Sequence, residues 1–539
     1  MFVASTQALL AARTNLSPET HQRRIDDRTT ELQHEIRALK ACRNSRSSAV
    51  ALPAEILSLV FLLVSQLYRG SEGDPRRPAR DKLHWIWVTH VCSHWRRVAL
   101  ECVTLWTDLS FDNPGFTELM LSRARSAPLT VTLTTVRQSH SQMHDILRRV
   151  LAQSDRLRTI TIRRYLGDTL DLPPILKACS RAAPALKTLS ICDEGIPAKF
   201  EIPQQFLAGG SPVLESLELP RCRVSSWDLL PLRTNLTSLK LSVYSSTDAN
   251  PARPSWLGLS TSLGQIPLLQ TLHLSHYLPH ADWQSFKSQT ALEWTSPIAL
   301  HRLRDLMLSD TSTTAIIDFL RLISQPLTTK IEITFHGTDS LEFIHPFFVK
   351  LRASQHIRDY GPAQELQIEG PHYFETVARF KLHSPAGLDR HLVLRFERPV
   401  LTTGKILTGL EEEVDYSSIS RLETESEELP EETWTSMFSS LTTLREIYLD
   451  VYIDEFSAAL SIANHGWLSS TRHLDTLRCE LRDEETFALS GFHPGVKRQT
   501  GINTRYHLAH GKRTQLHGNA VTGTTRTNPK SDDSMGWIL

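Results

Sequence analysis

The sequence lacks the features that would place catalytic chemistry in it directly. Its seven cysteines are an odd number and form no Cys-x-x-Cys pair, so neither a zinc site nor a disulfide framework is expected. Phosphate-binding loops, dinucleotide fingerprints, zinc-protease motifs and serine-hydrolase motifs are also missing. We therefore predict no catalytic residues, no metal ligands and no cofactor, and expect a protein that works by binding.

Net charge and long apolar runs are missing as well. Basic and acidic residues number 59 each, so nothing global indicates nucleic acid or an anionic membrane as the partner. The longest apolar run, from Leu59 to Val64, is far shorter than the roughly 20 residues that span a bilayer. Scattered cysteines of this kind are typical of a reducing compartment. We expect an intracellular protein, cytoplasmic or nuclear, with no membrane and no nucleic acid among its partners.

At 539 residues the chain is too long for one ordinary core, and its composition changes several times along its length. The tail is rich in Gly, Thr, Asn and basic residues, a composition that cannot bury enough surface to offset its ordering entropy. We divide the chain into a weakly structured N-terminus (1–18), a polar helix (19–45), a dense apolar and aromatic domain (46–111), a region of recurring strand signals (112–490) and a disordered tail (491–539).

The domain at 46–111 contains a helix whose apolar surface is too extensive to be buried by one core. Pro53 suits the first helical position, and Glu55 faces the positive end of the helix dipole. The following residues to about Tyr68 are apolar nearly all round, so a second face must be covered by something else, and a partner protein is the natural candidate. A polar insert (69–82) then precedes an expected second helix (83–100).

The stretches LPAEILSLVFLLVSQL and WVTHVCSHWRRVALECVTLWTDLSF resemble an F-box, particularly as found in large fungal F-box families. The matching features are Leu-Pro-x-Glu-Ile-Leu, the apolar run with Phe61, Val-Cys-x-x-Trp-Arg and a closing Leu-Trp. A generic helical hairpin is the alternative, and the insert at 69–82 is longer than the usual connection.

The resemblance implies docking on the Skp-family adaptor of a cullin–RING ubiquitin ligase, whose chemistry belongs to other subunits. Six residues of the first stretch would face the adaptor, and three of the second would divide between core and interface. The candidate adaptor-binding residues are Leu52, Pro53, Ile56, Leu57, Val60, Phe61, Val91, Cys92 and Trp95.

Behind this domain the pattern Leu-x-x-Leu-x-Leu recurs six times. The copies start at residues 157, 186, 214, 236, 269 and 303, so they are 29, 28, 22, 33 and 34 residues apart. That spacing is within or slightly beyond the leucine-rich repeat range of roughly 20–29. Degenerate copies follow at 330–335, 364–369, 444–449 and 474–479, while residues 337–362 and 397–440 break the rhythm.

The repeats predict an α/β fold, in which a small helical F-box module precedes an irregular leucine-rich repeat solenoid with a curved parallel sheet and convex helices. A conventional mixed α/β domain is the alternative. Leu214, Leu217 and Leu219 are expected to point inward. The non-leucine strand positions would line the concave side, and they are Glu215, Glu218, Lys240, His273, Arg304, Asp305, Arg445, Tyr448, Arg478 and Glu480. Among these we select His273, Arg304, Arg445 and Tyr448 as candidate substrate-binding residues, since Tyr and Arg dominate binding hot spots.

An acidic run between 411 and 432 has two interpretations, a solvated loop or a docking site for a basic partner, and we favour the loop.

Two functions fit the sequence. In the first, the chain is the substrate receptor of an SCF-type ubiquitin ligase, and its repeats hold an unknown protein substrate. In the second, it is a non-catalytic leucine-rich repeat scaffold or binding protein with no role in ubiquitination, whose F-box-like segment packs internally or serves outside ubiquitination. The two differ in whether the apolar helix at 53–68 is fully buried within the chain itself.

Overall fold

The structure is a computed structural model of residues 1–539. It describes residues 3–11, 17–50, 52–69, 79–111, 113–134, 141–165, 170–194, 200–224, 227–243, 253–280, 297–357, 362–372, 375–383, 389–424, 429, 431–449, 476–479, 496–499 and 505–508. The chain forms two compact units, Met1–Asp415 and Tyr416–Leu539. No helix in the described ranges combines the length and apolar character needed to cross a membrane.

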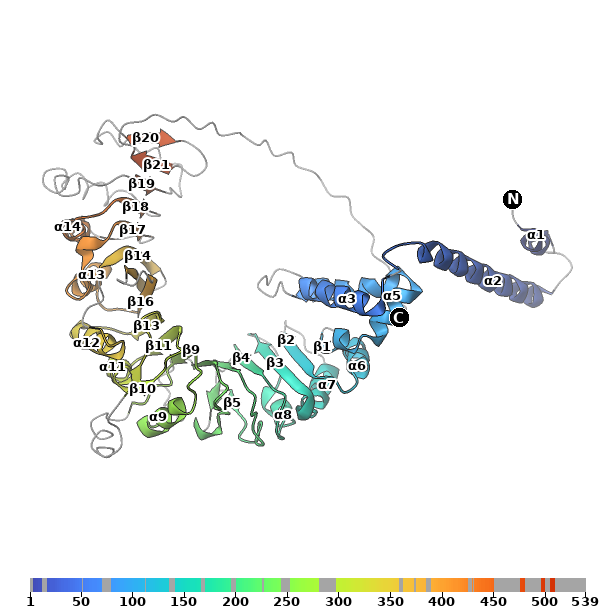
Figure 1. The fold of residues 1–539 in the computed structure, drawn as a ribbon, viewed down its shortest axis with the longest axis horizontal. Coiled ribbons are helices and arrows are strands. Elements are labelled where there is room, and N and C mark those ends of the chain that lie inside the picture. The colour runs from blue at the N-terminus through green and yellow to red at the C-terminus, as the bar shows by residue number, and fades with distance from the viewer. Residues whose placement is uncertain are drawn as a thin grey trace. The chain divides into compact units, whose positions relative to one another are not determined.

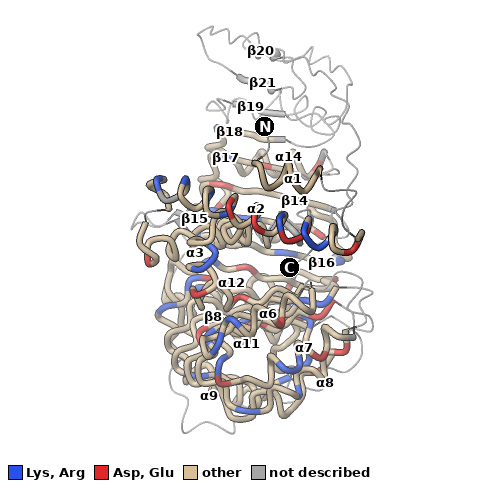
Figure 2. Tube along the Cα trace, turned by 90° about the vertical axis from the view of Figure 1, so that its right-hand side faces the viewer, with Lys and Arg blue, Asp and Glu red and all other residues tan. Residues whose placement is uncertain are grey.

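The first unit begins with two helices, α1 (Ala4–Ala11) and α2 (Pro18–Ser45). Residues 4–11 are thus helical, although we expected the first 18 residues to be weakly structured. The α2 helix starts where the sequence indicates, because the Ser17 hydroxyl accepts a hydrogen bond from the Thr20 amide (3.3 Å) and proline fills the first turn. Blue and red segments alternate along it in Figure 2, as a solvated helix requires.

The helical domain that follows is built from several short helices, which are α3 (Ala54–Arg69), the 3-10 helix η1 (Ala79–Trp87), α4 (Val88–Val91), α5 (Ser93–Glu101) and the 3-10 helix η2 (Val103–Trp106). The single helix expected over 83–100 is therefore interrupted. At the break, Cys92 adopts an extended conformation (φ −158°, ψ 169°) and its thiol accepts the Trp95 amide at 3.4 Å, which caps α5. The closing Trp106 is buried and donates its indole N–H to the Ala99 carbonyl (2.9 Å).

A large, mostly parallel sheet forms the rest of the first unit, with strand order β1-β2-β3-β4-β6-β8-β9-β11-β13-β16-β15-β14 (Figure 1). The six predicted repeat copies supply consecutive neighbours in this order, and every pairing between them is parallel. Their strands are β3 (Leu157–Arg164), β4 (Thr188–Asp193), β6 (Ser216–Pro220), β8 (Ser238–Ser242), β9 (Thr271–Ser275) and β11 (Asp305–Asp310). In the sheet order, β1 (Asp108–Leu109) and β2 (Leu129–Thr134) precede β3, and β13 (Lys330–His336) follows β11.

Leucines of the repeats form the core beneath this sheet. Leu217 is paired in register with Leu189 and Leu239, and all three are buried. Leu214 and Leu219 are buried too, so the predicted inward set is correct. Each such side chain contributes roughly 1.5–3 kcal/mol when it is removed from water, so these rows are the main source of stability in the unit.

Short helices and extensions connect the strands and run along one side of the sheet in Figure 1. The α-helices are α6 (Pro114–Arg123), α7 (Ser141–Leu151), α8 (Leu172–Leu176), α9 (Trp256–Gly264), α11 (Thr313–Leu322), α12 (Ile344–Ser354) and α13 (Thr403–Glu411). The 3-10 helices are η3 (Ser154–Arg156) and η4 (Trp227–Leu229). Two small parallel pairs join β5 (Glu201–Ile202) to β7 (Arg223–Val224) and β10 (Ile298–Ala299) to β12 (Ile323–Ser324).

The expected repeat copy at 364–369 has a different role from the other copies. It belongs to β14 (Ala363–His372), which pairs antiparallel with β15 (Glu375–His383), and β15 pairs antiparallel with β16 (Asp389–Glu397). On the side of β13 away from β11, the parallel neighbour is β16, which is the third strand of this group in the sequence. An antiparallel hairpin thus occupies the place where a further strand-and-helix unit was expected.

The second unit contains the 3-10 helix η5 (Tyr416–Ser418), β17 (Arg421–Thr424), α14 (Glu431–Ser440), β18 (Glu446–Leu449) and β19 (Thr476–Cys479). These three strands are parallel neighbours, so the strand-and-helix succession resumes within the stretch that we expected to break the rhythm. Two further strands, β20 (Val496–Gln499) and β21 (Arg505–Leu508), pair antiparallel in the segment that we expected to be disordered, and the rest of that segment lies outside the described residues.

Candidate functional site

The α3 helix has two apolar faces, and only one of them is covered by its own domain. Leu57, Phe61 and Ser65 follow one another at four-residue spacing and are buried. Phe61 lies against Trp95 of α5, with ring centroids 5.2 Å apart. This face is the core of the helical domain.

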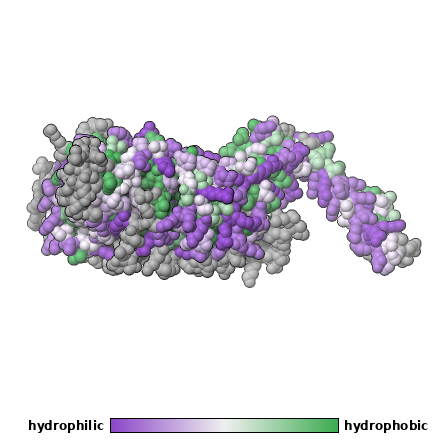
Figure 3. All heavy atoms as spheres, turned by 90° about the horizontal axis from the view of Figure 1, so that it is seen from below, coloured by the Kyte–Doolittle hydropathy of each residue, from purple (hydrophilic) through white to green (hydrophobic). Residues whose placement is uncertain are grey.

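The opposite face of α3 is exposed to solvent. At 100° per residue, positions 56, 59, 60, 63 and 67 fall within one stripe about 100° wide, which is centred roughly opposite Phe61 and Ser65. The exposed fractions are 44% for Ile56, 57% for Leu59, 37% for Val60, 60% for Leu63 and 78% for Leu67. Leu52, just before the helix, is 37% exposed. We call Leu52, Ile56, Leu59, Val60, Leu63 and Leu67 the α3 stripe, and Figure 3 shows apolar side chains gathered in this region beside the hydrophilic α2.

The structure divides the nine predicted adaptor-binding residues between these two faces. Leu52, Pro53, Ile56 and Val60 are exposed, as is Val91 at 53%. Leu57 and Phe61 are fully buried, so they shape the domain and offer no surface to a partner, contrary to our expectation for them. Trp95 and Cys92 are half-buried, one packed on Phe61 and the other capping α5. The exposed face also contains Leu59, Leu63 and Leu67, which were not selected from the sequence and which share the helical spacing of Ile56 and Val60.

A cluster of aromatic rings lies at the C-terminal end of α3, and Trp87 is its exposed member. Tyr68 contacts the His84 ring edge-on (5.8 Å), and His84 stacks on Trp87 (4.8 Å). Trp87 is 63% exposed. Exposed apolar surface of this size is costly for an isolated domain, so it marks an interaction site or a site prone to aggregation.

The second predicted site, on the polar face of the sheet, is a row of charges that pair with one another. Lys240 bonds Glu218 on the neighbouring strand (2.9 Å), and His273 on β9 contacts Asp305 on β11 (2.8 Å). Arg395 bonds Glu332 and Glu375, both at 2.7 Å. His273 is thus engaged within the sheet, whereas Arg304, at the amino end of β11, is exposed.

The other two predicted substrate residues belong to the second unit. The Tyr448 ring lies under the Arg421 guanidinium, 4.4 Å from the ring centroid, and its hydroxyl is 3.3 Å from Glu446. Arg445 is exposed. Of the concave-side residues predicted with them, Glu480 and the side chain of Arg478 lie outside the described residues.

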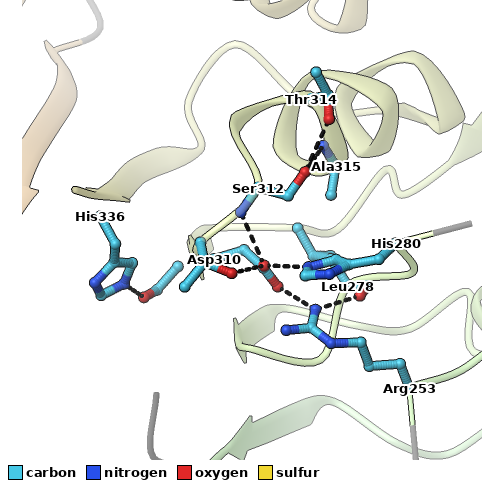
Figure 4. A network of polar contacts seen from close by, with 10 residues as sticks. Arg253, Leu278, His280, Asp310, Ser312, Thr314, Ala315 and His336 are labelled. Atoms are coloured by element: carbon cyan, nitrogen blue, oxygen red, sulfur yellow. Dashed lines mark hydrogen bonds and ion pairs between the residues drawn. The ribbon is translucent and has the colours of Figure 1, made fainter. Parts of the chain in front are cut away.

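Two buried aspartates end strands of the sheet, and neither was singled out from the sequence. Asp310, at the end of β11, accepts from Arg253 (2.8 Å) and the Ser312 amide (3.2 Å), and His280 lies 2.7 Å from it (Figure 4). Asp193, at the end of β4, pairs with Arg164 through both carboxylate oxygens. Burial alone raises the pKa of Asp310, but the His280 bond and the Arg253 charge outweigh burial and hold that pKa below its usual value.

A chain of bonds beside Asp310 has the order of groups seen in serine hydrolases. His336 connects Glu397 (3.0 Å) to the Ser309 hydroxyl (2.8 Å). Ser309 is only 5% exposed within β11, and these bonds connect the carboxyl ends of β11, β13 and β16. Burial, and then the neighbouring His336, lower the pKa of His276 to about 4.

The acidic run is less uniformly solvated than we expected. Glu413 is 7% exposed and bonds Arg352 of α12 (3.0 Å), and its other oxygen contacts His345. Residues 425–428 of the run lie outside the described residues. Within the described ranges no group of three or more His, Cys, Asp or Glu is arranged to hold a metal ion.

Comparison with protein-family models gives no match, and neither does comparison with curated proteins.

Proposed function

We propose that this chain is the substrate-recognition subunit of an SCF-type ubiquitin ligase. The α3 stripe docks on a Skp-family adaptor, and through it on a cullin–RING ligase, while the sheet holds an unknown protein substrate. The observation that carries the proposal is the exposed apolar face of α3, which begins at a Leu-Pro-x-Glu-Ile-Leu sequence and remains uncovered by the described parts of the chain. Such a partner acts in the cytoplasm or nucleus, which gives the proposed location.

In this proposal the residues of the F-box-like domain have distinct tasks. Leu52, Ile56, Leu59, Val60 and Leu63 supply contact area, and burying each on the adaptor is worth roughly 1–2 kcal/mol before the costs of association. Pro53 starts the helix, since its carbonyl accepts the Leu57 amide (3.0 Å). Leu57, Phe61 and Trp95 hold α3 against α5, so that the stripe is presented on a rigid support.

The substrate-binding part of the proposal rests on the succession of parallel strands. The Leu-x-x-Leu-x-Leu spacing and the in-register rows support a leucine-rich-repeat-like array behind the F-box-like domain. Such arrays use their open strand face or strand edges for binding, and this chain presents charged side chains on both.

The test is a co-expression and pull-down with a Skp-family adaptor. The variant Leu59→Asp with Leu63→Asp should lose adaptor capture by at least about a hundredfold, because an ionised carboxylate in a desolvated apolar interface costs several kcal/mol. The matched control is Leu257→Asp on α9, where the leucine is 51% exposed and far from the stripe in sequence.

Capture of the adaptor by wild type and by Leu257→Asp, with none by the double variant, supports the proposal. If wild type fails to capture the adaptor, or if the folded double variant captures it as wild type does, the proposal is wrong. The chain would then be the repeat-based binding protein that is the alternative from the sequence.

A further inference from the structure

The loops at the amino ends of the parallel strands form one edge of the sheet, and that edge is basic in a chain with no net charge. The loops before β2, β4 and β8 carry Arg125, Arg181, Lys187 and Arg233, and Arg158 is the second residue of β3. We call these five residues the basic edge. The loops from 124 to 237 at this edge, all of them described, hold the carboxylates Asp155 and Glu215. Cations thus outnumber carboxylates at this edge, although the whole chain carries equal numbers of basic and acidic residues.

Backbone bonds fix the spacing along this edge. The Lys187 amide donates to the Arg158 carbonyl, and the Glu215 amide to the Lys187 carbonyl, both at 2.8 Å. The Thr237 amide continues the row to Glu215 (2.8 Å). Neighbouring strands lie about 4.8 Å apart, so the edge from β2 to β8 spans roughly 19 Å, the length of about six extended residues.

The charges of the basic edge are not explained by the fold. Arg156 of the same loops serves the structure, since it donates to the Ala127 carbonyl (3.1 Å). By contrast Arg125, Arg158, Arg181 and Arg233 are exposed, and Arg158, Arg181 and Arg233 lie outside the α-helices, where the helix dipole gives no reason for a cation. Lys187 forms an exposed ion pair with Glu215, and a pair of this kind contributes little to stability.

A groove of about 570 Å³ with apolar side chains in its lining opens beside two of these cations, Arg158 and Lys187. Its apolar lining is formed by Pro128, Pro184, Ala185 and Val213. Its polar lining is formed by Arg158, Lys187, Asn235 and Glu215, and the Glu215 carboxylate is paired with Lys187. A groove of this kind accepts an aliphatic side chain, while Arg158 at the groove and the other cations along the edge bind carboxylates. Phe206 and Trp227, in the connections before β6 and β8, are buried at 8% and 5% exposure. The described part of the edge therefore presents no exposed Phe, Tyr or Trp on which single-stranded nucleic acid could stack.

We infer that the basic edge binds an acidic polypeptide segment of about six residues, with an aliphatic side chain seated in the groove. The inference goes beyond the adaptor docking proposed above and does not depend on it. The edge and the α3 stripe involve different residues, so either can fail alone.

The experiment measures fluorescence anisotropy of the full chain with three labelled probes. They are a ten-residue peptide of Asp and Glu with a central Leu, the same peptide with Lys in place of every acid, and a ten-nucleotide single-stranded RNA. The acidic peptide should bind, and its affinity should fall severalfold between 0.05 and 0.5 M salt (about 14 Å and 4 Å of screening length), because exposed charges are screened over about 10 Å at 0.1 M. The lysine peptide should not bind.

The variant Arg158→Glu with Arg181→Glu should weaken acidic-peptide binding by about tenfold or more. Its control, Arg37→Glu with Lys40→Glu on α2, makes the same charge change at exposed positions away from the edge and should leave binding within about twofold. Circular dichroism checks that both variants are folded, which is expected because all four side chains are exposed. Equal binding by the two variants, no binding of the acidic peptide by wild type, or tighter binding of the RNA than of the peptide would each overturn the inference. Adaptor capture should be unchanged in both variants, which separates this result from that of the proposed function.

Discussion

Two apolar side chains two residues apart on α3, Phe61 and Leu63, show how much depends on the face that a residue occupies. Phe61 is fully buried against Trp95, whereas Leu63 is 60% exposed. Replacing Phe61 by Ala should therefore lower the free energy of unfolding of the helical domain by about 3–5 kcal/mol, from lost burial and a cavity. Replacing Leu63 by Ala should change it by less than about 0.5 kcal/mol.

Urea denaturation followed by Trp fluorescence measures both, since Trp85, Trp95 and Trp106 belong to this domain. Leu63→Ala is the matched control, and equal losses in the two variants would contradict the assignment of faces. For the same reason Phe61→Asp should unfold the domain, so it cannot test adaptor docking.

Sequence reasoning could find this helix but could not choose its buried face. The residues from 56 to 64 are apolar on nearly every side, so hydrophobic periodicity gives no preferred direction. The buried face of α3 is decided by Trp95, which lies some 30 residues further along the chain and packs on Phe61. The position of Trp95 depends in turn on the helix break at Cys92, and the helical pattern of residues 83–100 gives no sign of that break. Of the residues on the exposed face of α3, Ile56 and Val60 were therefore selected from the sequence, whereas Leu59, Leu63 and Leu67 were not.

His276 should make the first unit sensitive to acid. Burial, and then the adjacent His336, lower its folded pKa from 6.5 to about 4, and Asp310, Arg253 and His280 are the other charged groups in its surroundings. Between pH 6.5 and pH 4, His276 binds a proton in the unfolded chain but stays neutral in the folded chain. The free energy of unfolding therefore falls as the pH drops from about 6.5 towards 4. The loss is on the order of 1–3 kcal/mol.

The variant His276→Asn removes this titration and keeps a residue that tolerates the positive φ of 60° found there. Thermal melts at pH 7 and pH 4.5 should differ less for the variant than for wild type. Identical pH dependence in the two proteins would show that His276 is not the group responsible.

At the scale of elements, the spacing of leucines predicted the parallel strands well because each repeat must place the same side chains in the same core. The six copies became β3, β4, β6, β8, β9 and β11 in an unbroken parallel order. The antiparallel β14–β16 insertion was missed because QELQIE alternates like any half-buried strand, and alternation does not give strand direction. Direction follows here from the length of the connection, because two residues separate β14 from β15 and a connecting helix needs more.

Gly370 supports this hairpin through its lack of a side chain. Its φ is +116°, and a Cβ there would lie 2.2 Å from the Glu375 carbonyl oxygen, a backbone atom that cannot move aside cheaply. Gly370→Ala should therefore lower the melting temperature by several degrees, corresponding to roughly 2–4 kcal/mol.

Gly337 provides the comparison. It has a φ of +62°, but a Cβ there meets nothing within 4 Å, so Gly337→Ala should cost only the backbone strain of about 1 kcal/mol. Equal melting temperatures for the two variants would contradict the role given to the close contact at Gly370.

For the whole molecule, the balanced composition conceals two specialised surfaces. A count of 59 charges of each sign indicates no polyanionic partner, yet parallel strands bring every amino-end loop to the same edge, where Arg and Lys accumulate. Similarly, an ordinary apolar fraction conceals the exposed stripe of α3. Neither surface can be inferred from totals, because each depends on which residues the fold places side by side.

The last prediction is that these two surfaces act independently. The stripe lies on α3 and at Leu52 just before it, whereas the basic edge lies in the loops before β2, β4 and β8 and at the start of β3. Effects at separated sites without shared partners usually add. A chain carrying Leu59→Asp and Leu63→Asp should lose adaptor capture and bind the acidic peptide within about twofold of wild type. A chain carrying Arg158→Glu and Arg181→Glu should show the reverse, and the fourfold variant should lose both. Pull-down and anisotropy on the same four preparations measure this. A loss of peptide binding in the stripe variant would contradict this independence and would have one of two causes. Either the helical domain supports the folding of the first strands, or the two surfaces are energetically coupled. Circular dichroism of that preparation distinguishes the two causes, because only the first removes secondary structure.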